Sequence, residues 1–204
     1  MNLYESLIKN VGIGKEVLVR QWIKNHTRVN DPKSVEYKNG KISYNYLDLY
    51  LEEELPDYIA FDNVKHFNII NMSKRKLKLN PAQLPEEAEY VILNGFDLTN
   101  TTLKLNLIGV REVYISDCIC KNTVIDAPYA NLLLYNLDSI IEGISSKNAT
   151  GIQLTDLDMA KLISKLKGDI DGNVRKIFKK FPKVEKITCT SFCISKAGGK
   201  WILD

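Results

Sequence analysis

A short hydrophobic pattern recurs six times between residues 67 and 191 of this 204-residue chain. In each occurrence two apolar residues stand one position apart, and a small polar residue follows two positions later. The occurrences begin at Phe67, Tyr90, Val113, Leu132, Ile152 and Ile187, in steps of 23, 23, 19, 20 and 35 residues. One short strand per twenty-odd residues is typical of a solenoid, in which each coil adds one strand to a parallel ladder.

The polar residue that closes each pattern is predicted to stabilise the turn by which the chain leaves the sheet. These residues are Asn71, Asn94, Asp117, Asn136, Asp156 and Ser191. A short polar side chain can bond backbone groups that a turn would otherwise bury without a partner. The alternative is that they are ordinary loop residues after ordinary strands.

A proline precedes three of the predicted strands, in the pairs Leu55-Pro56, Leu84-Pro85 and Phe181-Pro182. Proline fixes its own backbone angle and holds the preceding residue extended, which suits a chain that turns back toward a sheet. With these pairs, residues 55–194 resemble the leucine-rich-repeat family, whose repeats read L-P-x-x-L-x-x-L-x-L-x-x-N. The likeness is strongest over residues 84–137.

The resemblance points in particular to the degenerate repeat proteins of bacteria and bacteriophages, which often open with a helix similar to the LYESLI segment of this chain. It implies an α/β fold, an irregular leucine-rich-repeat-like solenoid with a parallel strand ladder. The chain departs from the family in two ways. Its polar residue comes one place earlier than the family's Asn, and Tyr, Val, Ile and Cys replace consensus leucines. A different right- or left-handed β-solenoid is therefore the alternative.

An N-terminal helical cap and a β-hairpin are predicted for residues 1–54. Apolar residues at helical spacing predict helices over 2–11 and 15–25, which would cover the open end of the first coil. Asn39-Gly40, between two alternating runs, predicts a hairpin over 34–51. A DNA-binding helix-turn-helix is the alternative for the two helices.

The predicted solenoid occupies residues 55–204 and carries a helical insertion at 156–181. The insertion has apolar residues at helical spacing and a capping residue, Thr155 or Asp156, at its start. Trp201 and Ile202 are expected to close the far end of the solenoid.

The outward side of the predicted ladder is the candidate binding surface. If Tyr90 and Ile92 point inward, strand alternation sends their neighbours outward. The outward residues of adjacent strands are then Ile70, Val91, Leu93, Tyr114, Leu133 and Tyr135. A contiguous exposed apolar patch indicates a binding site, so we expect a protein partner or a second copy of the chain there. The alternative is that the hairpin or the N-terminal helices cover this side.

Basic residues gather in the predicted insertion and support a second hypothesis. They include Lys161, Lys165, Arg175, Lys176, Lys179 and Lys180. Such a surface can contact phosphates, so a nucleic-acid-associated protein using the helices at 161–186 is the alternative function. Amphipathic helices also turn charged residues to solvent without any binding role.

No residue pattern predicts an enzyme, a metal site or a cofactor. His26 and His66 stand apart from any nucleophile or second metal ligand, and the chain has no glycine-rich phosphate loop or nucleophile elbow. The four cysteines fall at C-x-C and C-x-x-x-C spacings, which differ from those of zinc sites. We therefore expect a non-enzymatic protein.

Composition narrows the class of protein further. The chain is 45% hydrophobic and 26% charged with a formal net charge of +3, which excludes intrinsic disorder. It has no apolar run long enough to span a membrane, and its N-terminus lacks the layout of a signal peptide. We expect a cytoplasmic protein without a membrane partner.

Overall fold

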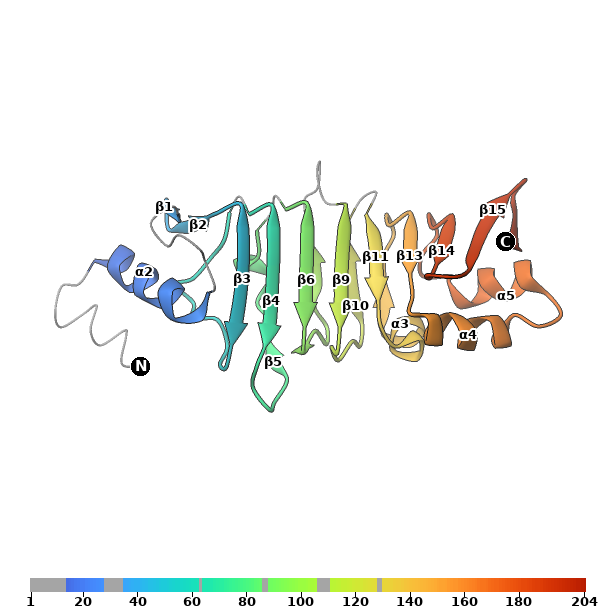
Figure 1. The fold of residues 1–204 in the computed structure, drawn as a ribbon, viewed down its shortest axis with the longest axis horizontal. Coiled ribbons are helices and arrows are strands. Elements are labelled where there is room, and N and C mark those ends of the chain that lie inside the picture. The colour runs from blue at the N-terminus through green and yellow to red at the C-terminus, as the bar shows by residue number, and fades with distance from the viewer. Residues whose placement is uncertain (1–13, 28–34, 63, 86–87, 106–110, 128–129) are drawn as a thin grey trace.

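The computed structural model describes residues 14–27, 35–62, 64–85, 88–105, 111–127 and 130–204, and its architecture is a β-solenoid of about five turns. One nine-stranded sheet runs the length of the molecule (Figure 1). In spatial order its strands are β3 (Tyr46–Leu51), β4 (His66–Asn71), β6 (Tyr90–Asn94), β9 (Glu112–Ser116), β11 (Asn131–Leu134), β13 (Gly151–Gln153), β14 (Lys186–Thr188), β15 (Cys193–Ala197) and β16 (Lys200–Leu203). The strands from β3 to β14 pair in parallel.

The interior of the solenoid is built from apolar side chains that stand in register on successive strands. The first inward row consists of Leu47, Phe67, Val91, Val113, Leu132, Ile152, Ile187 and Ile194. The second consists of Leu49, Ile69, Leu93, Ile115 and Leu134. All of these side chains are buried. The coils of about 21 residues therefore share one hydrophobic core, as the repeat predicts.

The predicted orientation of β6 is wrong by one residue. Val91 and Leu93 are 0% exposed and face the core, whereas Tyr90 and Ile92 face outward. The sequence Tyr-Val-Ile-Leu is apolar at four successive positions, so its alternation does not define which residues point inward. The coil before β6 is consequently one residue longer, and the coil after it one residue shorter, than the sequence pattern indicates.

The return half of the coils contributes shorter strands that the sequence did not reveal. β8 (Thr102–Lys104), β10 (Thr123–Asp126) and β12 (Ile144–Ser145) pair in parallel behind the long sheet (Figure 1), and β5 (Leu77–Lys78) pairs with β7 (Phe96–Asp97). A 3-10 helix, Pro81–Gln83, precedes β6. Leucine-rich repeats commonly return through a helical segment. Here strands also form much of the return side.

The start of the ladder is covered by α2 (Lys15–His26), which confirms the second predicted helix. Its buried residues are Leu18, Val19, Trp22 and Ile23, and Thr27 bridges to Leu49 on the edge strand β3. This contact covers an edge whose backbone groups would otherwise be free to pair with another chain. The predicted helix over 2–11 lies outside the described residues.

The predicted hairpin is present but shorter than expected. β1 (Glu36–Lys38) and β2 (Lys41–Ser43) are joined by Asn39 and Gly40, whose φ angles of 52° and 78° are those that a two-residue hairpin turn requires. The following segment, β3, pairs with β4 over six residues instead of extending the hairpin. The ladder therefore begins at residue 46, within the segment that the sequence assigned to the hairpin.

Helices and a second hairpin form the last coils. α4 (Asp156–Lys165) and α5 (Ile170–Ile177) confirm the predicted insertion, and the Thr155 side chain caps α4 by accepting from the Asp158 N–H. α3 (Leu137–Gly143) and the β15–β16 hairpin were not predicted. Trp201 is buried on β16, whereas Ile202 is 40% exposed, so only the tryptophan closes this end. No described helix is long and apolar enough to cross a membrane.

Asp158 joins two of these helices through backbone hydrogen bonds. Its carboxylate is almost fully buried and accepts from the N–H groups of Asn136 and Leu137, at 2.9 and 3.1 Å, where α3 begins. It also accepts from the Thr155 hydroxyl at 3.0 Å. One side chain at the start of α4 thus satisfies the free backbone donors at the start of α3.

The inward orientation of Leu93 can be tested by comparing two truncations on β6. Leu93→Ala should lower the free energy of unfolding by about 2–5 kcal/mol, because it opens a cavity in the core. Ile92→Ala should cost less than about half as much, because its side chain is already partly in water. Urea unfolding measures both. Equal costs, or a larger cost at Ile92, would contradict this orientation.

The role of Asp158 can be tested against a second aspartate in the first turn of a helix. Asp158→Ala should lower the free energy of unfolding by about 1–3 kcal/mol, since two backbone donors lose their acceptor. Asp138→Ala removes only an exposed ion pair with Lys165 and should change stability little. If thermal unfolding shows the two variants to be equally stable, Asp158 does not hold α3 in place.

Candidate interaction surface

The outward side chains of β3 to β14 form one surface, which we call the outer face. Figure 1 looks onto it, and none of the described helices or strands crosses it. The described part of the N-terminal region, α2 and the β1–β2 hairpin, lies at the end of the ladder instead. Within the described residues, the outer face is therefore open to a partner.

Strand register arranges the outer face in three rows. The first row is Tyr46, His66, Tyr90, Glu112, Asn131, Gly151 and Lys186. The middle row is Asp48, Asn68, Ile92, Tyr114, Leu133, Gln153 and Thr188. The third row is Tyr50, Ile70, Asn94 and Ser116, and Tyr135 follows just beyond the end of β11.

Three aromatic rings of the first row are stacked on one another. The ring centroids of Tyr46 and His66 are 5.1 Å apart, and those of His66 and Tyr90 are 4.6 Å apart, with interplanar angles of 26° and 12°. These distances are close to the spacing of neighbouring strands, so the ladder itself brings the rings into contact. Tyr46, on the outermost strand, is 58% exposed. The stack holds three side chains in fixed positions at one end of the outer face.

Tyr114 and Tyr135 form a second aromatic pair on neighbouring coils. Their ring centroids are 5.0 Å apart, and their hydroxyl groups are hydrogen-bonded to each other. Partial burial, followed by the hydrogen bond to Tyr135, raises the pKa of Tyr114 to about 12. The Tyr114 phenol is therefore neutral near pH 7, and the pair adds apolar ring area and polar hydroxyl groups to the surface.

Four of the six residues predicted for the binding surface lie together on the outer face. Ile70, Tyr114 and Leu133 are partly exposed, and Tyr135 is 39% exposed. The other two, Val91 and Leu93, are buried in the core because of the one-residue error on β6. Their places are taken by Tyr90 and Ile92, which the sequence assigned to the interior. The apolar surface is thus continuous across β4, β6, β9 and β11.

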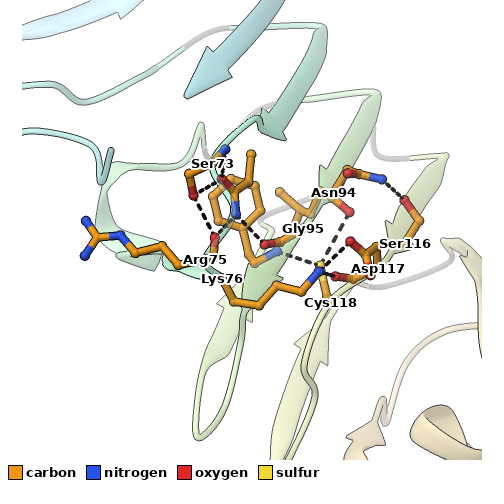
Figure 2. A network of polar contacts seen from close by, with 11 residues as sticks. Ser73, Arg75, Lys76, Asn94, Gly95, Ser116, Asp117 and Cys118 are labelled. Carbon is orange, nitrogen blue, oxygen red and sulfur yellow. Dashed lines mark hydrogen bonds and ion pairs between the residues drawn. The ribbon is translucent and has the colours of Figure 1, made fainter. Parts of the chain in front are cut away.

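A polar network links the coils where β4, β6 and β9 end (Figure 2). The Asn71 amide donates to the carbonyl oxygens of Gly95 and Arg75, at 2.8 and 2.6 Å, and accepts from the Ser73 N–H at 2.8 Å. Lys76 binds the Asp117 carboxylate two coils further on. The predicted stabilising role of the polar residue is confirmed at Asn71, and this network is structural.

Asn94 does not have the turn role that the sequence assigned to it. Its amide donates to the Ser116 hydroxyl at 2.6 Å, on the outer face (Figure 2). The register position of Asn71 on the next coil is occupied by Gly95, whose φ of 86° suits glycine. This follows from the same one-residue error on β6.

Most of the predicted basic residues are engaged within the chain. Lys165 pairs with Asp138 and Arg175 with Asp171, at 2.7 and 3.0 Å. Lys161 lies 3.6 Å from Asp158, and Lys180 donates to the carbonyl oxygen of Glu142 at 2.8 Å. No ion pair of Lys176 or Lys179 is found in the described part of the chain.

The described residues contain no group of three or more His, Cys, Asp or Glu side chains that could hold a metal. Burial raises the pKa of the Cys118 thiol and raises that of Cys120 to about 12. Thiols that stay protonated are poor nucleophiles and poor metal ligands, so these two cysteines serve packing.

An open cavity of about 650 Å³ lies beside α2, lined by Asn25, His26, Thr27, Tyr50, Glu52, Glu53 and Met72.

No family model, curated protein or solved structure matches the chain.

The Tyr114–Tyr135 contact predicts a measurable change in acidity. Tyr135→Phe should lower the pKa of Tyr114 from about 12 toward the ordinary value of 10.0, because the hydrogen-bond partner is lost. It should stay above 10.0, since burial is the largest cause of the shift. Tyrosinate absorbance during an alkaline titration measures this change, with Tyr46→Phe as the control that leaves Tyr114 unaffected. An unchanged pKa in Tyr135→Phe would show that the two hydroxyls do not interact.

The same shift fixes the sign of a pH effect on stability. The pKa of Tyr114 is higher in the folded protein than in the unfolded chain, so the unfolded state loses its proton first as the pH rises. The contribution of the Tyr114 hydroxyl group to the free energy of unfolding is therefore complete below about pH 10 and is lost between about pH 10 and 12.

Proposed function

We propose that this protein is a non-enzymatic protein-binding module whose partner docks on the outer face. The observation that carries the proposal is the continuous row Ile92, Tyr114 and Leu133 on three adjacent strands, with further aromatic side chains on either side. Contiguous apolar surface is uncommon on soluble monomers and marks binding sites. Tyrosine is also among the residues that dominate binding energy at protein interfaces.

The shape and chemistry of the surface favour a protein over a small molecule. Small ligands are usually held in concave sites that bury most of their area. The outer face is instead a sheet surface several strands wide, with aromatic groups held by stacking before any partner arrives. Preorganised side chains lose little conformational entropy on binding. Such a face therefore suits a partner that contacts it over a broad area, as a protein does.

We also propose that the chain is related to the degenerate leucine-rich-repeat proteins of bacteria and bacteriophages. It is supported by the Leu-Pro pairs and by coils of about 21 residues, which fall within the length range of such repeats. A cytoplasmic location is likewise proposed, because the four cysteines are all free, as in a reducing compartment.

Nucleic-acid binding by the basic helices is the second candidate function. It is favoured by Lys176 and Lys179 on and just after α5, which make no ion pair in the described part of the chain. The internal partners of Lys161, Lys165, Arg175 and Lys180 argue for the outer face as the first candidate.

Affinity capture with matched surface variants tests the two candidates. Immobilised wild-type protein is exposed to a lysate of its source cells, beside Tyr114→Glu on the outer face and Lys176→Glu/Lys179→Glu on the basic helices. A charge in the middle of the apolar surface should abolish capture of the specific protein partner. The basic variant should retain it, and moderate salt should weaken capture little, because few phosphates are contacted.

The opposite pattern would overturn the proposal. If capture persists in Tyr114→Glu, is lost in the lysine variant and falls steeply with salt, the protein binds nucleic acid through its basic helices. Circular dichroism of each variant confirms that the fold is kept. Ile92→Gln provides a second, milder outer-face variant should Tyr114→Glu be unstable.

A further inference from the structure

The middle row of the outer face is nearly symmetric about Tyr114. Reading outward from this residue, an aliphatic side chain comes first on each side, Ile92 or Leu133. An amide follows, Asn68 or Gln153. The row ends in a polar residue, Asp48 on β3 and Thr188 on β14. A surface with this order is complementary to itself when it is turned around its centre.

We propose that the partner on the outer face is a second copy of this chain, related by a two-fold axis that runs along β9 at Tyr114. This inference rests on the proposed function and specifies the partner. A two-fold axis that lies between two facing sheets and runs parallel to the strands reverses the order of the strands and keeps their direction. It is the isologous arrangement in which one patch serves both copies.

This axis brings compatible side chains together in the middle row. β6 of one copy faces β11 of the other, so that Ile92 packs against Leu133 of the second copy. β4 faces β13 and sets Asn68, whose amide donates to the Asp48 carboxylate at 2.9 Å, opposite the polar Gln153 of the second copy. Tyr114 meets its own equivalent on the axis. Apolar groups form the centre and polar groups the rim, as in most protein interfaces.

The first row supports the same arrangement through charge. The stacked ring of His66 on β4 faces β13 of the second copy, where the Asn131 side chain lies over Gly151. β3 faces β14, which brings acidic Asp48 near basic Lys186 of the second copy. The alternative axis, across the strands along the middle row, would set Asp48 against Asp48. Each axis sets one carboxylate against its own equivalent, but only the axis along β9 also brings together the opposite charges of Asp48 and Lys186, so charge favours this axis.

One contact opposes association, and removing it tests the proposal. Glu112, on β9, faces its own equivalent across the axis. Like charges that face each other weaken binding. A variant without this charge should therefore dimerise more tightly. Binding of an unrelated partner protein gives no reason to expect that effect.

The available area predicts a reversible dimer. The outer face from β3 to β14 spans about 29 Å across the strands and about 15 Å along them, by ordinary sheet spacings. With its protruding side chains, this comes near the roughly 600 Å² per partner of weak, transient interfaces. The dimer should dissociate on dilution.

Sedimentation equilibrium of the purified chain over a wide concentration range tests the proposal. We expect a mass that rises from monomer to dimer and no further. Tyr114→Glu should remain monomeric at every concentration. Glu112→Gln should dimerise at least about fivefold more tightly, because the repulsion on the axis is removed. A monomer throughout, or a dimer that Tyr114→Glu leaves intact, would overturn the proposal.

Cross-linking locates the axis without relying on loss of binding. Ser116→Cys places a thiol on the axis, and a short bis-maleimide should join two copies of this variant. Gln153→Cys, on β13, faces β4 of the second copy, lies about 19 Å across the strands from its own equivalent and should not cross-link to itself. Wild type controls for the four native cysteines. Cross-linking of both variants alike, or of Gln153→Cys alone, would contradict an axis along β9.

The two proposals fail in distinguishable ways. If the purified chain is monomeric while Tyr114→Glu still loses a captured protein of a different sequence, the outer face binds that protein and self-association is excluded. If neither dimer formation nor capture depends on Tyr114, both proposals are wrong.

Discussion

The in-register apolar row from Leu47 to Ile194 is the contact on which the rest of the structure depends. Each strand is too short to be stable alone, and it buries its inward side chains only by stacking on its neighbours. Because all coils share one core, a strand that shifted by one residue would expose its apolar side chains and bury its polar ones. The core thereby fixes the register, and the register fixes which side chains reach the outer face.

Local signals in the sequence predicted those elements that local chemistry determines. Asn39-Gly40 predicted a hairpin turn because few other pairs tolerate two positive φ angles. A capping residue, Thr155 or Asp156, predicted the start of α4, and Thr155 is the cap because its hydroxyl accepts from a free backbone donor. The strands of the return side, only two to four residues long, have too few positions to establish an alternation. Their pairing depends on neighbouring coils, which a local pattern does not contain.

The candidate surface was predicted in part, and its errors have one cause. Strands such as Glu112–Ser116 alternate clearly, so Tyr114 was assigned to the correct side. On β6 four successive apolar residues hide the alternation. The prediction therefore placed Val91 and Leu93 on the outer face and Tyr90 and Ile92 in the core, which is the reverse of the structure. The stack of Tyr46, His66 and Tyr90 was missed because it depends on register between coils. Aligning the coils on Gly95 instead of Asn94 would have placed Tyr90 beside His66, whereas Tyr46 lies in the segment assigned to the hairpin.

The most direct test of this account is the accessibility of four successive positions on β6. Cysteine replaces Tyr90, Val91, Ile92 and Leu93 in separate variants, and mass spectrometry follows thiol labelling of each position in the native protein. The account predicts rapid labelling at positions 90 and 92, and protection at 91 and 93 until the protein unfolds. Rapid labelling at 91 and 93 with protection at 90 and 92 would contradict it, and would remove the outer face as described.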